Sequence, residues 1–509
     1  MSDWGSGYVT DTAYVHDFCR VQTPPMLALA ALAGGVEAPA GAGEAVDYCD
    51  LGCGQGYTAN LIAAANPAAQ VLGVDFNPSH IANARAFANA AQLSNVEFRE
   101  ASFEEIAADP TVPQFDIMAM HGVFSWISAQ NRRAIVALIA KRLKPGGLLY
   151  VSYDCMPGWA GVAPLRRIMA RRFAPRAGLP SSAALERAIA YSDSLRGADA
   201  RFHRMFPNVE AQMERLKKTP RAYLAHEILT RDWEAFSFGE VADELAEAKL
   251  AYVGSAYLTD SVDRVNFTEA QQVFLASLED ATLREETRDM LLARQFRRDV
   301  FAKGIAATNQ RRIRTRWLDT RFAMTSLEKD FDMTFDTPIG KLQLRPDVHG
   351  SLIELLRRGP IALRDAIEGL PQPPANWGSI TDAIKVLVGR GDLQPALPAA
   401  GDAARAASVR AFNAAVLERA MESAEFGYLA SPVTGGAVRV DRVAQLFLFA
   451  RQRGVADPTE MVAALAPHET PTGGEGTPPS TDAGRAFAQS ETARIEANVL
   501  PVLKQLGID

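Results

Sequence analysis

Three glycines and two aspartates stand at a spacing that could bind a nucleoside-like ligand. Asp50-Leu51-Gly52-Cys53-Gly54-Gln55-Gly56 joins an apolar stretch to a helix-compatible one, and a second apolar stretch ends in Asp75. Glycines at a strand-to-helix turn let the backbone approach a ligand closely, and an acid at the end of the next strand suits two ribose hydroxyls. The pattern therefore predicts ligand contacts from Asp50, Gly52, Gly54, Gly56, Asp75 and the adjacent Phe76.

The position of the glycines favours one cofactor class. A nicotinamide or flavin fingerprint needs its third glycine one place after Gly56, where this chain has Tyr57. Asp50 precedes the first glycine, and a carboxylate there suits a cationic amino-acid group better than a pyrophosphate. The residues therefore predict S-adenosylmethionine as the cofactor, and the alternative is a set of glycines that serves only a tight turn.

The same loop resembles the acid-x-G-x-G-x-G loop of the seven-strand class I methyltransferases. In such enzymes an acid after the third strand often contacts the adenine amino group, whereas this chain has Ser102-Phe103 after Glu100-Ala101. The resemblance therefore implies Ser102 as a substitute hydrogen-bonding group. Phe103 is expected either to offer its backbone N–H or ring to the cofactor, or to pack in the core.

Two longer segments resemble a narrower family. His121-Gly122-Val123-Phe124-Ser125-Trp126-Ile127-Ser128 and Val151-Ser152-Tyr153-Asp154-Cys155-Met156-Pro157-Gly158-Trp159 are similar to the HGVYSWVP and SYNxxPGW signatures of methyltransferases with a methyltransferase regulatory domain. That family includes the rickettsial lysine methyltransferases that act on an outer membrane protein. Residues 221–257, 296–299 and 429–436 continue the resemblance. It also implies that Tyr8 and Tyr14 close over the cofactor from the N-terminal side.

The acceptor chemistry is expected at the second of these segments. Asp154 replaces the asparagine of the family, Phe124 its tyrosine and Ser128 its proline. A carboxylate can accept a hydrogen bond or a proton from an amine, so Tyr153 and Asp154 are the predicted catalytic residues. Trp126 and Trp159 are predicted to contact the substrate, because aromatic faces attract cations by about 0.5–2 kcal/mol, or else to be buried packing residues. His121 is expected near the cofactor, as a base or as a group that fixes its loop.

These residues need a parallel sheet to hold them. Apolar runs near residues 46–51, 70–75, 96–98, 115–120 and 148–153 alternate with helix-compatible stretches, which is typical of consecutive βαβ units. The fold class expected is α/β, a Rossmann-like seven-strand class I methyltransferase domain followed by helical and α+β accessory domains. The predicted division is a methyltransferase domain with its lid (1–160), a helical insertion or dimerisation segment (161–215), a regulatory domain (216–305), a basic segment with a winged-helix-like domain (306–400) and a C-terminal helical domain (401–509).

Composition excludes several classes of protein. The 509 residues exceed one compact core, and 48% hydrophobic and 22% charged residues are typical of globular proteins. The net charge of −7 argues against a nucleic-acid partner, although nine Lys/Arg residues between Arg294 and Arg321 form a basic run that could be a salt-bridged surface or a binding patch. Four cysteines without ligand spacing predict no metal site and fit a reducing bacterial cytoplasm. The longest apolar runs are too short for membrane insertion.

These observations predict an S-adenosylmethionine-dependent methyltransferase. The resemblance favours a protein side chain as the acceptor, with lysine first, and a homodimer is a further expectation. Two alternatives stay open: a methyltransferase for a small metabolite or a glycan, and a noncatalytic regulator that binds the cofactor without turnover.

Overall fold

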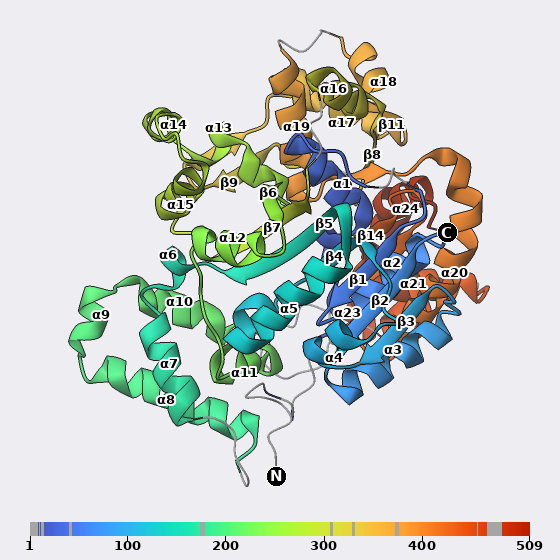
Figure 1. The fold of residues 1–509 in the computed structure, drawn as a ribbon. Coiled ribbons are helices and arrows are strands. Elements are labelled where there is room, and N and C mark those ends of the chain that lie inside the picture. The colour runs from blue at the N-terminus through green and yellow to red at the C-terminus, as the bar shows by residue number, and fades with distance from the viewer. Residues whose placement is uncertain are drawn as a thin grey trace.

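The computed structural model describes residues 9, 11, 15–39, 43–173, 179–305, 309–327, 331–371, 376–455, 457–465 and 481–508. A seven-stranded sheet forms its centre, with helices on both faces (Figure 1). The described part of the chain contains no helix with the length and apolar character needed to cross a bilayer.

Five parallel strands form the first part of the sheet, and all five lie where the sequence predicts them. They are β1 (Asp47–Leu51), β2 (Gln70–Asp75), β3 (Val96–Glu100), β4 (Phe115–Met120) and β5 (Leu143–Asp154). The strand order β3-β2-β1-β4-β5 reverses direction between β1 and β4. The carboxyl ends of strands beside such a switch point form the usual ligand crevice of an open α/β sheet.

Two strands from a distant part of the chain complete the sheet. β7 (Phe296–Lys303) pairs antiparallel with β5, and β6 (Leu250–Ser255) pairs with β7 at the edge. The seven-strand fold class is confirmed. The two strands that complete the sheet and cover the edge of β5 come after the predicted boundary at residue 160, and the division into domains stays a prediction.

Alternate residues of the strands contact different helices on the two faces. One face packs against α1 (Pro24–Ala33), α2 (Tyr57–Ala65) and α3 (Pro78–Ala90). The other face packs against α4 (Phe103–Ala108), α5 (Ala129–Arg142) and α12 (Phe238–Ala246). Tyr150 and Val151 show the alternation, since they belong to these two separate cores.

A helical segment follows β5 and has a core of its own. It comprises α6 (Met156–Trp159), α7 (Ala163–Arg172), α8 (Ser181–Gly197), α9 (Arg201–Met205), α10 (Asn208–Lys217) and α11 (Arg221–Leu229). Three more helices lie between β6 and β7 and near the sheet edge: α13 (Asp263–Asn266), α14 (Glu269–Ala276) and α15 (Ala281–Leu292). The predicted helical character of residues 161–215 agrees with the structure, while the homodimer stays a prediction.

The region predicted to contain a winged helix combines short strands and helices. It contains α16 (Gln310–Asp319), β8 (Arg321–Met324), the hairpin β9 (Thr334–Thr337) and β10 (Gly340–Gln343), α17 (Ser351–Leu356), β11 (Ile361–Ala362), α18 (Leu363–Glu368), α19 (Trp377–Arg390) and β12 (Leu393–Ala396). β8 lies between β11 and β12, antiparallel to both. The winged helix stays a prediction.

The C-terminal elements pack behind the glycine loop, where Figure 1 shows them in orange and red beside α2. They are α20 (Asp402–Arg419), β13 (Tyr428–Ser431), β14 (Gly436–Arg439), α21 (Arg442–Gln452), α22 (Pro458–Leu465), α23 (Thr481–Arg494) and α24 (Leu500–Gln505). Tyr57 of α2 donates a hydrogen bond to the Tyr428 carbonyl at 2.6 Å and stacks on Phe412. The helix α2, which begins at the glycine loop, therefore contacts the C-terminal elements as well as the sheet.

Candidate active site

The loop from Asp50 to Gly56 has the backbone that its glycines permit. Gly52, Gly54 and Gly56 have φ values of +73°, +54° and +70°, a region that side chains other than glycine rarely adopt. A Cβ on Gly56 would lie 2.5 Å from Cβ of Ala84, so this glycine allows α2 to approach α3. Gly52 and Gly54 instead line a cavity.

This cavity has a volume of about 670 Å³, within the usual range of ligand pockets. Seven of the predicted site residues line it: Asp50, Gly52, Gly54, His121, Trp126, Asp154 and Trp159. The end of α10 and the loop before α11 also line the cavity, and there Leu216 and Thr219 are half-buried and Pro220 is exposed. The carboxyl ends of β1, β4 and β5 therefore open into one space.

The Asp50 end of the cavity is suited to a cation. Asp50 is 3% exposed, and burial raises its pKa to about 7. Gln22, from the 3-10 helix η1 (Arg20–Gln22), donates a long hydrogen bond of 3.4 Å to Oδ1 of Asp50. Its own Oε1 is buried and has no hydrogen-bond partner among the described residues. A bound ammonium group would fit between these acceptor atoms.

Asp75 braces the glycine loop. Its Oδ2 accepts a hydrogen bond from the Gly54 N–H at 2.9 Å, and its Oδ1 accepts one from the Asn77 N–H at 2.9 Å and lies 3.2 Å from Nδ1 of His80. The side chain does not line the cavity formed by the described residues. The predicted ribose contact therefore stays a prediction. The structure shows in addition that the Asp75 carboxylate holds the glycine loop in place.

Ser102 and Phe103 do not line this cavity either, and the same holds for Phe76 among the described residues. Ser102 begins α4: it accepts a hydrogen bond from the Glu105 N–H, and the Glu105 carboxylate accepts one from the Ser102 N–H. Phe103 packs against the core that contains α4 and α5. The geometry favours helix capping and core packing for these two residues over the predicted adenine contacts.

His121 is neutral and held by its neighbours. Its Nδ1 lies 2.8 Å from the Tyr150 hydroxyl and 3.1 Å from Oγ of Ser152. Burial, and then the nearby positive charge of Arg298, lowers the pKa of His121 to about 4. Because Nδ1 already contacts two hydroxyl groups, the geometry favours a His121 that fixes its loop over one that acts as a base.

The other end of the cavity has aromatic walls around a buried carboxyl group. Asp154 is 4% exposed, and Oδ2 accepts a hydrogen bond from Nε1 of Trp233 at 2.6 Å. Burial raises the pKa of Asp154 above its usual range. Trp126 belongs to the 3-10 helix η2 (Phe124–Trp126), and Trp159 packs edge-on against Trp233. Both predicted tryptophans therefore face the cavity beside Asp154.

The predicted catalytic role of Tyr153 does not fit the structure. Successive side chains of a strand point to opposite faces, so Tyr153 and Asp154 cannot both face the cavity. Tyr153 is fully buried in the core on the other face, and its hydroxyl donates to Oδ2 of Asp299 at 2.7 Å. Tyr153 thus supports the sheet.

Sequence reasoning missed several lining residues. Tyr223, His226 and Glu227 come from α11, and Phe296 and Arg298 from β7. The family signatures at 221–227 and 296–299 marked these segments but gave no indication that they border the cofactor site. Tyr8 and Tyr14 lie outside the described residues, yet Val15, Asp17, Cys19 and Gln22 from the same end of the chain line the cavity.

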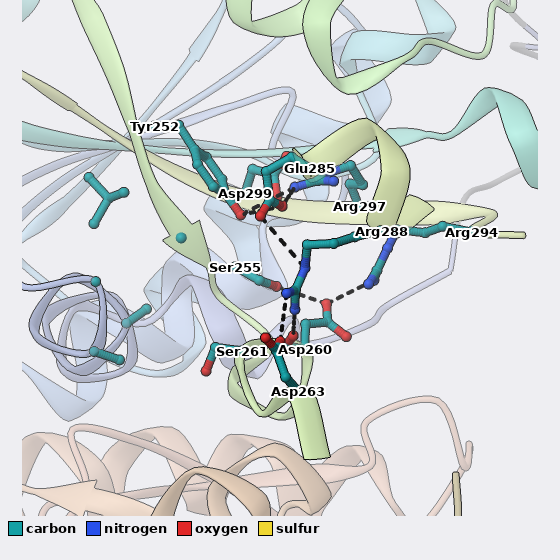
Figure 2. Close-up of a pocket in the computed structure, with 15 residues that line it drawn as sticks. Tyr252, Ser255, Asp260, Ser261, Asp263, Glu285, Arg288, Arg294, Arg297 and Asp299 are labelled. Atoms are coloured by element: carbon teal, nitrogen blue, oxygen red, sulfur yellow. Dashed lines mark hydrogen bonds and ion pairs between the residues drawn. The ribbon is translucent and has the colours of Figure 1, made fainter. Parts of the chain in front are cut away.

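A second cavity of about 280 Å³ lies at the sheet edge beside β6 (Figure 2). Figure 2 shows Arg288 and Arg294 reaching toward Asp260, and Arg288 also pairs with Asp263. Arg297 pairs with Asp289, Asp299 and Glu285 at 2.8–2.9 Å. Two members of the basic run, Arg294 and Arg297, are therefore neutralised inside the protein.

Two family models match the chain. One is described as a methyltransferase domain and matches residues 43–176, and the other is described as a predicted methyltransferase regulatory domain and matches residues 220–303. The second match covers α11, β6 and β7, the elements that complete the sheet and the cavity.

Two similar proteins match nearly the whole chain, and a third matches about a fifth of it. An uncharacterised protein of Synechocystis is 35% identical over 506 residues, 99% of each chain, and trans-aconitate 2-methyltransferase of Methylobacterium nodulans is 31% identical over 102 residues, 20% of this chain and 36% of that one. PKMT2 from Rickettsia typhi, solved in complex with AdoHcy, has the same fold, with a TM-score of 0.68, 17% identity and coverage of 97% of this chain and all of that one. The chain belongs to the class I S-adenosylmethionine-dependent methyltransferases that carry a methyltransferase regulatory domain.

Proposed function

We propose that this enzyme methylates a side-chain amine of a protein, with lysine as the preferred acceptor. The observation that carries the proposal is the buried Asp154 carboxyl in a cavity that Trp126 and Trp159 also line, since a carboxyl and aromatic faces suit a cationic group. The exposed Pro220 and half-buried Leu216 and Thr219 among the lining residues suit a side chain that enters from a polypeptide. The fold shared with PKMT2 and the resemblance to rickettsial lysine methyltransferases support it.

S-adenosylmethionine supplies a methyl group on a positively charged sulfur when it is bound. We propose that Asp50 and Gln22 hold the amino-acid ammonium of the cofactor, and that the backbone at Gly52 and Gly54 lets the cofactor lie close to β1. Asp154 orients the acceptor amine. Because methyl transfer is an in-line displacement, the main tasks of the protein are alignment and exclusion of water.

A radiolabel assay tests this proposal. The purified enzyme is incubated with S-adenosylmethionine labelled on its methyl group and with protein from a strain that lacks the enzyme, and the protein is then hydrolysed to amino acids. We expect labelled methyl-lysine with the wild type and at least a tenfold loss with Asp50→Ala. Label confined to small molecules or glycans would contradict a protein acceptor, and cofactor binding without any transfer would indicate a noncatalytic regulator.

A further inference from the structure

Helix α11 places a buried carboxyl group opposite Asp154. Glu227 is 6% exposed and lines the same cavity as Asp154. Tyr223 lies one turn earlier on the helix and lines the same cavity. The acceptor end of the cavity therefore contains two carboxyl groups, one from the methyltransferase sheet and one from the segment that matches the regulatory domain.

Arg166 lies beside Asp154 and Glu227, but it donates its hydrogen bonds to main-chain carbonyl groups. Nε donates to the Glu227 main-chain carbonyl at 2.8 Å and Nη2 to the Thr230 carbonyl at 3.1 Å. The guanidinium lies over the rings of Trp233 and Trp126, 4.3 Å and 5.4 Å from their centres. Within the part of the chain that the structure describes, no ion pair joins Arg166 to either carboxyl group. Arg166 thus adds one positive charge beside the two carboxyl groups, and a bound cationic acceptor would add a second.

The two carboxyl groups differ in their surroundings. Asp154 accepts a hydrogen bond from the indole of Trp233, and such a bond favours the ionised form and fixes its orientation. Burial, followed by the charge of Asp154, raises the pKa of Glu227 well above its usual range. Asp154 is therefore suited to holding a cation in place, and Glu227 to accepting a proton from it.

We propose that Glu227 selects a cationic amine as the acceptor and removes its proton, with Arg166 as a positioning residue. This inference rests on the proposed function. The bound ammonium gives a proton to the Glu227 carboxylate, which leaves a neutral amine. The amine nitrogen then bonds to the methyl carbon as the carbon–sulfur bond breaks and its electron pair stays on sulfur. The proton on Glu227 passes to water.

A binding experiment tests this role without a known acceptor. The full-length protein, saturated with AdoHcy, is titrated with n-butylammonium, which mimics the lysine side chain, and with neutral n-butanol of the same length. We expect the wild type to bind the cation at least tenfold more tightly than the alcohol. Glu227→Gln should lose most of that preference and bind AdoHcy within twofold of the wild type. The matched control is Glu247→Gln, which changes an exposed carboxylate just after α12 and should behave as the wild type.

The outcomes separate this inference from the proposed function. A Glu227→Gln variant that keeps the preference for n-butylammonium would overturn the role of Glu227, whatever the acceptor is. A wild type that prefers the cation through Glu227 but forms no methyl-lysine would contradict the proposed function alone. If Glu227→Gln fails to bind AdoHcy, the pH dependence of the wild type decides: its affinity for n-butylammonium should rise at least fivefold as Glu227 ionises, and a flat profile would overturn the inference.

Discussion

At the scale of single residues, the Asp50 carboxylate suits a cationic ligand but lowers the stability of the cofactor-free protein. Its pKa is raised to about 7 by burial, whereas the unfolded chain ionises an aspartate near 3.9. The unfolded state therefore loses its proton first as pH rises, so Asp50 costs the cofactor-free protein stability that grows from about pH 4 to about pH 7. One pKa unit corresponds to about 1.4 kcal/mol, so the full cost is of the order of a few kcal/mol.

Asp50→Asn should accordingly change stability and binding in opposite directions. We expect this variant to unfold at a higher temperature than the wild type at pH 8 without cofactor, and at a similar temperature at pH 4. Its affinity for AdoHcy should fall at least tenfold at pH 8, because the neutral amide cannot balance an ammonium charge. Calorimetric melting and titration check both parts. A lower melting temperature at pH 8 with unchanged affinity would contradict the assignment of this carboxylate.

His121 should stay neutral throughout the physiological range. Because burial lowers its pKa to about 4, we expect its imidazole resonances in NMR spectra to be constant between pH 5.5 and 8. The resonances of His16 can be compared with those of His121 in the same spectra. His16 is only half-buried, and burial is the main cause that lowers its pKa. A His121 midpoint near the unperturbed 6.5 would show that the ring is solvated, and would reopen its role as a base.

At the scale of elements, β7 shows how one strand serves two sites. Phe296 and Arg298 face the cofactor cavity, while Arg297 and Asp299 face the ion-pair network of Figure 2. Arg297 is 4% exposed and its partners Asp289 and Asp299 are each 1% exposed. Arg297→Met would leave the buried Asp299 carboxylate without its cation and Asp289 with Arg294 as its remaining cation, and breaking a buried ion pair typically costs 3–5 kcal/mol.

Denaturant unfolding of the Arg297→Met variant checks this expectation. The matched control is Arg312→Met, because Arg312 is 60% exposed and pairs with Glu37 at the surface, where an ion pair contributes about 0–1 kcal/mol. Equal losses in the two variants would mean that the network adds nothing beyond a surface ion pair. Cofactor affinity should change little in the Arg297 variant if Arg298 keeps its place in the cavity.

The sequence predicted the elements that carry local signals. Five strands were placed correctly because each is an apolar run before a turn, and Asp50 and Asp154 were identified from the strand ends. β6 and β7 could not be assigned to the same sheet, since β7 pairs with β5 about 150 positions earlier in the chain and β6 joins the sheet only through β7. Tyr153 was misjudged because adjacent residues at a strand end face opposite sides. Glu227 was missed because its role depends on how α11 packs.

At the scale of the whole molecule, the N-terminal segment links the cofactor cavity to the accessory domains. Gln22 contacts Asp50, and Arg20 two residues earlier donates to the carbonyls of Val388 and Gly389 at the end of α19. Gly389 also lies against Thr259 of the 3-10 helix η3 (Leu258–Ser261). Three distant parts of the chain thus meet beside the site, and their packing should affect how η1 holds Gln22.

Gly389→Ala tests this coupling directly. The added Cβ would lie 1.8 Å from Oγ1 and 2.9 Å from the backbone nitrogen of Thr259, so α19 or η3 must move. Overpacking of this kind typically costs 1–3 kcal/mol, and we expect a lower melting temperature together with a several-fold loss of AdoHcy affinity. Gly197→Ala at the end of α8 is the control, because its Cβ would meet no atom within 4 Å, and we expect little change in stability or affinity. Reduced stability with unchanged affinity in Gly389→Ala would show that the accessory domain packs against the N-terminal segment without influencing the cofactor site.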